Sequence, residues 1–131
     1  MTEKLSSILP SYNVTMNTFA EAVWGVLLQK YNYSEDAVFG KVVSGRDALI
    51  PGIENILGIF INTIPVRVSG NSGDKFVEIV QKLQLQSSES MIFSRCSLAD
   101  IISGSKVGSH LINTVLVFEN YPAQTVDEDG E

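Results

Sequence analysis

The stretch FGKVVSGRDALIPGIENILGIFINTIPVRV, from Phe39 to Val68, decides how this chain folds. It contains most of a first apolar run rich in β-branched residues, over 37–44, and the whole of a second, over 59–68, with a Gly- and Pro-containing loop over 45–52 after the first run. The first run is typical of a buried strand. The second contains Pro65, which cannot donate a backbone hydrogen bond to a neighbouring strand, so we expect an edge position or a bulge there.

A helix is predicted before this stretch, over residues 15–31. Its apolar residues form two stripes, which indicates a helix buried on two sides. One stripe contains Phe19, Val23, Val26, Leu27 and Lys30, and the other contains Trp24, Leu28 and Tyr31. Two residues compete for the N-cap: Thr18, which forms a capping-box pattern with Glu21, and Thr15.

The remaining elements are assigned by the same patterns. We expect a loop over 1–14, one helical turn over 53–57 ended by Gly58, and an irregular segment over 87–96. A second long helix is predicted over 74–86, capped by Ser72 or Asp74, with a core face of Phe76, Ile79, Val80 and Leu83. A short helix over 97–102 with Ser97 as its cap, a loop over 103–109 and a third strand over 111–118 complete the pattern.

This order of elements predicts the α/β class, with a mixed β-sheet and helices packed mainly on one face. Three strands make a narrow sheet.

Composition excludes several classes of function. The chain has 131 residues, enough for one domain or part of one, and a net charge of −6. Four acidic residues lie in the last five positions, so the body is nearly neutral and offers no basic patch for nucleic acid. The acidic end, 123–131, is typical of a solvated, disordered tail.

The expected location is cytoplasmic. Cys96 is the only cysteine, so no internal disulfide can form, as is usual in a reducing compartment. No apolar run reaches the roughly 20 residues that a membrane helix needs. The first ten residues show no secretory signal pattern.

The residues that usually carry catalysis are scarce. His110 is the only histidine, and no spacing of His, Cys, Asp or Glu is typical of a metal site. No glycine-rich nucleotide motif is present. We therefore predict no catalytic residue and no metal ligand in this chain.

Two polar segments are candidates for binding. Ser44, Gly45 and Arg46 follow the first predicted strand, where ligand groups often collect, although a plain turn with Arg46 paired to Asp47 or Glu54 explains the same pattern. Asn62 and Thr63 interrupt an apolar strand. Buried polar groups need partners, so this pair either fixes the strand by hydrogen bonds or forms a polar patch at an interface.

Four motifs together resemble the condensation domains of nonribosomal peptide synthetases, which belong to the chloramphenicol-acetyltransferase-like superfamily. They are SGR at 44–46, PGIE at 51–54, GIFINTIPVR at 58–67 and FENYP at 118–122. The resemblance covers 15–122 and only part of the family's second, C-terminal lobe, between a lead-in segment at 1–14 and the tail at 123–131. Ser97 stands where the family commonly has proline.

The resemblance implies a fragment of an amide-forming enzyme. The family's HHxxxDG motif lies in the first lobe and is absent here, so we expect no activity from this chain alone. It implies that Ser44, Gly45, Arg46, Asn62 and Thr63 border the substrate tunnel, with Ser44 lining it and Arg46 organising the loop. The implied partners are the first lobe and carrier proteins. The family's second lobe continues with further strands, so the resemblance also implies at least one unpaired sheet edge here, through which copies of the chain can self-associate. The phosphopantetheine arms of those carriers are substrates, and no cofactor is bound directly.

Two other interpretations remain open at this point. The chain could derive from an epimerization domain, which shares HHxxxDG and much of the fold, although GIFINTIPVR favours condensation. It could also be a stand-alone binding or assembly piece that pairs with another chain.

Overall fold

The structure is a computed structural model that describes residues 2–46, 51–71 and 73–119. Its elements, with η for a 3-10 helix, are α1 (Thr2–Ile8), η1 (Leu9–Tyr12), α2 (Met16–Asn32), β1 (Asp36–Val43), η2 (Ile53–Asn55), β2 (Asn62–Ser69), α3 (Phe76–Ser90), η3 (Met91–Phe93), α4 (Leu98–Gly104), η4 (Gly108–His110) and β3 (Val115–Leu116). The end of the FENYP motif and the acidic tail lie outside the described residues. No helix in the described ranges is long and apolar enough to span a membrane.

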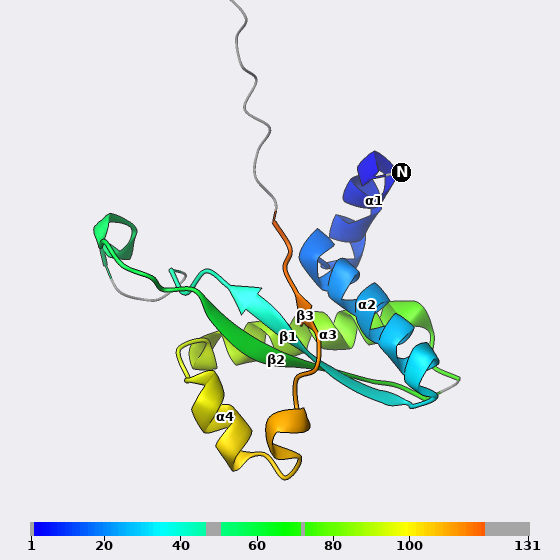
Figure 1. Ribbon diagram of the computed structural model, residues 1–131. Helices are drawn as coiled ribbons and strands as arrows, with labels where there is room; N and C mark the ends of the chain where they lie inside the picture. The colour runs from blue at the N-terminus through cyan, green and yellow to red at the C-terminus, as the bar shows by residue number, and fades with distance from the viewer. Residues whose placement is uncertain (1, 47–50, 72, 120–131) are drawn as a thin grey trace, which may run out of the picture.

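The three strands form one mixed sheet in the order β2-β1-β3 (Figure 1). Strand β1 pairs with β2 antiparallel from Asp36↔Ser69 to Val43↔Asn62, and with β3 parallel at Gly40↔Val115. The predicted fold class is thus confirmed. The pairing of β1 with β2 brings the SGR and GIFINTIPVR motifs to the same end of the sheet.

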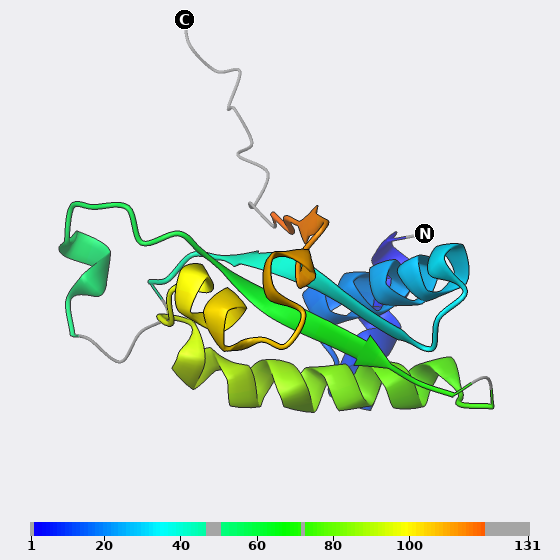
Figure 2. The same ribbon diagram turned by 60° about the horizontal axis from the view of Figure 1, so that its bottom comes forward.

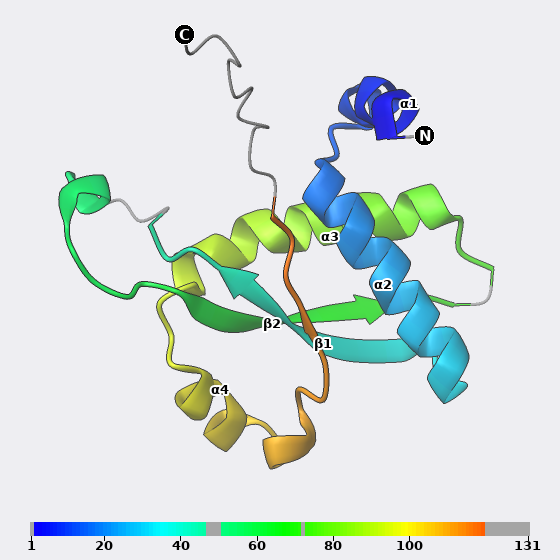
Figure 3. The ribbon, with the colours of Figure 1, turned by 45° about the horizontal axis from the view of Figure 1, so that its top comes forward.

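Helices α2 and α3 lie on one face of the sheet (Figure 3) and enclose the core with it. Phe39 and Val68 from the strands pack there with Ala22 of α2 and Val80 of α3. The opposite face carries the stretch that leads into β3. A methyl group added at Gly40 would lie only 3.0 Å from the Ile112 side chain on that face.

The predicted core stripe of α2 is wrong in part. Val23 and Leu27 are exposed, whereas Gly25, Glu21 and Gln29 are buried. Gly25 lies so close to β2 that an added methyl carbon would be 2.2 Å from the Val68 side chain. Helix α2 therefore packs on the sheet through the face that carries this small residue, and the polar residues on the same face form hydrogen bonds or an ion pair. The Gln29 amide donates to the Val68 carbonyl at 3.0 Å and to the Glu35 carbonyl at 2.7 Å.

The caps are partly as predicted. Thr15, not Thr18, caps α2, because its hydroxyl accepts a hydrogen bond from the Thr18 N–H at 3.1 Å. Ser97 caps α4 as predicted and accepts from Ala99 N–H. Asp74 is not the N-cap of α3, which begins after Lys75, whose N–H donates to the Glu78 carboxylate. The other predicted cap, Ser72, lies outside the described residues.

Other boundaries differ from the sequence pattern. Residues 2–12 are helical instead of a loop, since Leu5 and Leu9 turn one side of this segment toward the core. Helix α3 extends to Ser90, into the segment expected to be irregular, and α4 and η4 occupy parts of the predicted 103–109 loop. The third strand, predicted over 111–118, has only two residues, because only Val115 and Leu116 pair with β1.

Pro65 stands on the edge strand, as predicted. The Gly40 N–H donates to the Thr114 carbonyl on the β3 side, so it does not point toward β2. Pro65 stands opposite Gly40 in the β1–β2 ladder, and its backbone accordingly faces away from β1. Arg67, two residues on, also faces outward, and its main chain meets the Gln86 amide of α3. With the amide assigned to the orientation that satisfies both groups, its nitrogen donates to the Arg67 carbonyl at 3.0 Å and its oxygen accepts from the Arg67 N–H at 3.2 Å. The β2 edge is therefore partly closed.

Candidate functional site

The two candidate motifs meet where the β1–β2 ladder ends. Ser44 follows β1 directly, and Asn62 begins β2 opposite Val43. Beyond this point the chain leaves the sheet and projects away from the body, which Figure 2 shows on the left around η2. We call the described residues 51–61 of this projection the arm.

Gly45 makes the base of the arm possible. Its φ angle is +67°, and a Cβ atom there would lie 1.9 Å from the Phe60 carbonyl oxygen. Only glycine combines left-handed backbone with so close an approach. The chain just after β1 and the chain just before β2 are therefore in close contact.

Arg46 organises the arm, as the resemblance implied. Its guanidinium donates to the carbonyl oxygens of Ile53 at 2.9 Å, Ile56 at 3.1 Å and Gly58 at 3.2 Å. It also lies 4.8 Å from the centre of the Phe60 ring, in a cation–π contact. Of the predicted alternative partners, Asp47 and the Glu54 side chain lie outside what the structure describes.

Asn62 joins the arm base to the turn before α4. Its side-chain nitrogen donates to the carbonyl oxygens of Ser94 at 2.7 Å and Cys96 at 2.8 Å, and its oxygen accepts from the Thr63 N–H. Both ends of the amide are engaged within the chain. For Asn62, these bonds correspond to the first interpretation, in which hydrogen bonds fix the strand. Thr63 turns its methyl group toward Gly40, on the face of the sheet opposite α2 and α3.

Two surface hollows lie beside the end of the β1–β2 ladder, and each is lined by some of the predicted tunnel residues. One, of about 490 Å³, is lined by Gly45 and Asn62 together with Arg95. The other, also of about 490 Å³, is lined by Ser44 with residues of α2 and α3. Arg46 and Thr63 line neither, so the five residues share one region without converging on one cavity. Their tunnel role stays a prediction.

A buried ion pair beside the second hollow was missed by the sequence reasoning. Lys41 Nζ lies 2.7 Å from the Glu21 carboxylate, with side chains exposed by 15% and 1%. Asn17 donates to the same carboxylate at 2.7 Å, and Lys41 also reaches the Ser87 hydroxyl at 3.3 Å. The available signal was a lysine inside an apolar strand, which needs a partner when buried.

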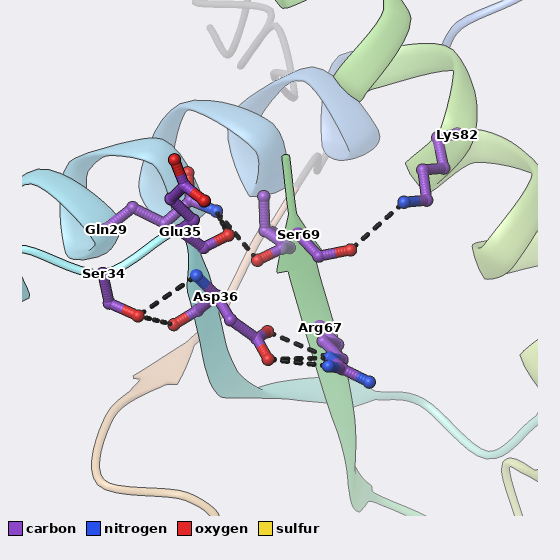
Figure 4. A network of polar contacts seen from close by, with 8 residues as sticks. Gln29, Ser34, Glu35, Asp36, Arg67, Ser69 and Lys82 are labelled. Atoms are coloured by element: carbon purple, nitrogen blue, oxygen red, sulfur yellow. Dashed lines mark hydrogen bonds and ion pairs between the residues drawn. The ribbon is translucent and has the colours of Figure 1, made fainter. Parts of the chain in front are cut away.

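The opposite end of the ladder carries a polar network (Figure 4). Arg67, the last motif residue of GIFINTIPVR, forms a bidentate pair with Asp36 at 2.7–3.1 Å on the outer side of the sheet. Hydrogen bonds from Arg67, then its charge, lower the pKa of the Asp36 carboxyl. Both side chains are well exposed, so the pair contributes little stability.

The described residues provide no catalytic constellation. No group of three or more His, Cys, Asp or Glu residues in the described ranges is arranged to hold a metal ion. His110 is exposed in η4, and Cys96 is exposed in the turn before α4.

Comparisons with known proteins agree with this geometry. The family model "Condensation domain" matches residues 1–131. The chain is 43% identical over 121 residues to bacitracin synthase 3 of Bacillus licheniformis, and 43% identical over 122 residues to tyrocidine synthase 2 of Brevibacillus parabrevis. The two matches cover 92% and 93% of this chain but only 2% and 3% of these relatives.

Solved structures share the fold. The first condensation domain of the CDA synthetase aligns with a TM-score of 0.76 and 19% identity, covering 92% of this chain and 27% of that chain. A four-domain nonribosomal peptide synthetase bound to AMP and glycine also aligns with a TM-score of 0.76, at 22% identity, covering 91% of this chain and 9% of that one. The chain belongs to the condensation-domain family of nonribosomal peptide synthetases and corresponds to a part of that domain.

Proposed function

We propose that this chain forms one wall of an amide-forming channel and works only with a lobe that supplies HHxxxDG. The observation that carries the proposal is the meeting of SGR and GIFINTIPVR at one corner, where Gly45 packs on Phe60 and Asn62 fixes the turn before α4. A wall of this kind needs a rigid shape more than reactive groups. The internal bonds of Arg46 and Asn62 provide that rigidity.

In the proposed reaction, the amine of one carrier-bound aminoacyl group attacks the thioester carbon of another. The C–N bond forms and the C–S bond of the attacked thioester breaks. The phosphopantetheine thiol of the carrier that held this thioester leaves with the proton that the amine loses, and the product stays on the carrier that supplied the amine. An imidazole of the HHxxxDG lobe positions or deprotonates the amine. This chain contributes by holding two tethered substrates close together.

A hybrid domain tests the proposal. Residues 1–131 replace the matching segment of a homologous condensation domain, and amide product on carrier proteins is followed by mass spectrometry. We expect product from the hybrid and none from the chain alone. A matched hybrid with the second HHxxxDG histidine changed to alanine should be inactive. A folded hybrid without product would overturn the proposal.

The same replacement in an epimerization domain separates the two related activities. The segment should restore amide formation in the condensation hybrid and fail to restore inversion of the α-carbon in the epimerization hybrid. The reverse result would assign the chain to the epimerization domains.

A further inference from the structure

Among the described residues, β2 is an outer strand of the sheet, and its free edge is met by side chains of the chain itself. In an antiparallel ladder, alternate residues turn their backbone N–H and C=O groups away from the partner strand. Because Pro65 stands opposite Gly40, whose N–H points to the β3 side, the outward positions of β2 include Thr63, Pro65 and Arg67. Such an edge ordinarily accepts a further strand.

None of these three positions offers a free N–H group. The Asn62 side-chain oxygen accepts from the Thr63 N–H at 2.8 Å, and proline has no N–H at position 65. The Gln86 amide of α3, in its assigned orientation, accepts from the Arg67 N–H at 3.2 Å and donates to the Arg67 carbonyl at 3.0 Å. One amide therefore forms the two hydrogen bonds with Arg67 that a residue of a neighbouring strand would form.

The contact between α3 and the β2 edge repeats along the helix, which runs beside β2 (Figure 2). Lys82, one helical turn before Gln86, donates to the Ser69 hydroxyl at 3.1 Å (Figure 4). Four residues advance a helix by about 6 Å, and two residues advance a strand by about 7 Å. Lys82 and Gln86 therefore keep step with Ser69 and Arg67. The next outward position along β2 is Pro65, where no N–H needs a partner.

We propose that Gln86 takes the place of a neighbouring strand and, with Asn62 and Pro65, blocks strand addition at the β2 edge. The strand that it excludes is β2 of a second copy of this chain. Two identical edges can pair antiparallel about a twofold axis, so no other partner is required. Gln86 is only half-buried, so its replacement should leave the core intact.

Hydrogen–deuterium exchange of single amides, followed by NMR, tests the bonds of Gln86. Gln86→Ala should speed exchange of the Arg67 amide by about tenfold, because this N–H loses its acceptor. Gln81→Ala is the matched control, since Gln81 is an exposed glutamine of the same helix, and it should change that rate by no more than about twofold. An Arg67 amide that exchanges equally fast in the two variants would overturn the proposal.

Light scattering at rising concentration tests whether the edge opens. Gln86→Ala combined with Pro65→Val removes the amide and restores a backbone N–H, so we expect dimers. Pro65→Val combined with Gln81→Ala is the control and should remain monomeric, because Gln86 still occupies the edge. Both variants also carry Val117→Lys, which keeps the β3 edge from contributing. A folded Gln86 variant that stays monomeric at every concentration would reject the blocking role.

The exchange rate also locates the contact in any dimer that forms. As the concentration rises, exchange of the Arg67 amide in the Gln86→Ala and Pro65→Val variant should slow again, because the strand of the second copy supplies a new acceptor. Dimers in which this amide still exchanges fast would place the contact elsewhere and contradict the proposal. If the combined variant does not fold, Gln86→Ala alone decides, since faster Arg67 exchange with weaker association is expected from it.

Discussion

At the scale of single residues, glycine and arginine determine the shape of the arm base. Gly45 has left-handed backbone and sits against a carbonyl oxygen, while Arg46 satisfies three carbonyl groups that no regular element would pair. Both residues belong to the SGR motif. The glycine and the arginine of this motif are therefore explained by backbone geometry and hydrogen bonding.

We expect Gly45→Ala to destabilise the chain by about 1–3 kcal/mol or more, since the substitution adds both backbone strain and a clash with Phe60. The control is Gly52→Ala, because Gly52 has a similar φ of +78° but nothing within 4 Å of its missing Cβ. Urea unfolding of both variants measures the difference. Equal losses would mean that the contact with Phe60 contributes nothing.

The buried pair should behave as a unit. Lys41→Met alone leaves the Glu21 carboxylate without its cation and should cost about 3–5 kcal/mol, whereas Lys41→Met with Glu21→Leu should recover most of that loss. Denaturant unfolding of the two single variants and the double variant gives the coupling energy. Lys82→Met, which changes an exposed lysine bonded to Ser69, should be nearly neutral.

The exposed pair predicts a weak pH dependence. The pKa of Asp36 is lower in the folded chain than in the unfolded chain, so its contribution is complete above the unfolded pKa and is lost as the pH falls through the folded one. Arg67→Gln should raise the pKa of Asp36 in an NMR titration and flatten the stability profile in the acid range. An unchanged Asp36 titration would contradict the assignment of Arg67 as the cause.

At the scale of elements, the contact between α2 and β2 depends on Gly25. Alanine is the better helix former by about 1 kcal/mol, so local propensity alone favours Gly25→Ala. The added methyl would overlap Val68, and overpacking typically costs about 1–3 kcal/mol. We expect net destabilisation in thermal unfolding. Gly104→Ala in α4, where nothing lies within 4 Å, should be neutral or stabilising.

At the scale of the whole molecule, the two sheet edges differ. The β2 edge carries Pro65 and meets Gln86. Among the described residues β3 pairs only with β1, and Val115 in β3 and Val117 just after it are exposed. If copies self-associate through an edge, as the sequence predicted, β3 is the expected one. Light scattering at rising concentration should then show larger species that Val117→Lys removes. Species unaffected by that change would exclude this edge.

The sequence by itself determined the family, the mixed sheet and the positions of the main elements. The apolar, β-branched runs of β1 and β2, the cap at Ser97 and the edge position of Pro65 are local signals, since they depend on nearest neighbours and backbone chemistry. The motifs identified the family, and for one motif residue, Gly45, the structure shows that backbone geometry requires it.

The tertiary structure alone decided which face of α2 is buried, how Glu21 meets Lys41 and where the exposed apolar residues gather. Hydrophobic periodicity favoured Val23 and Leu27, but the close approach of Gly25 to Val68 and the partners of the polar residues reversed that choice. Such contacts join residues far apart in the chain, so no local pattern encodes them. For the same reason, no local pattern predicts that Leu57 and Ile59 are exposed. Their exposure accompanies the arm conformation that Arg46 holds by hydrogen bonds.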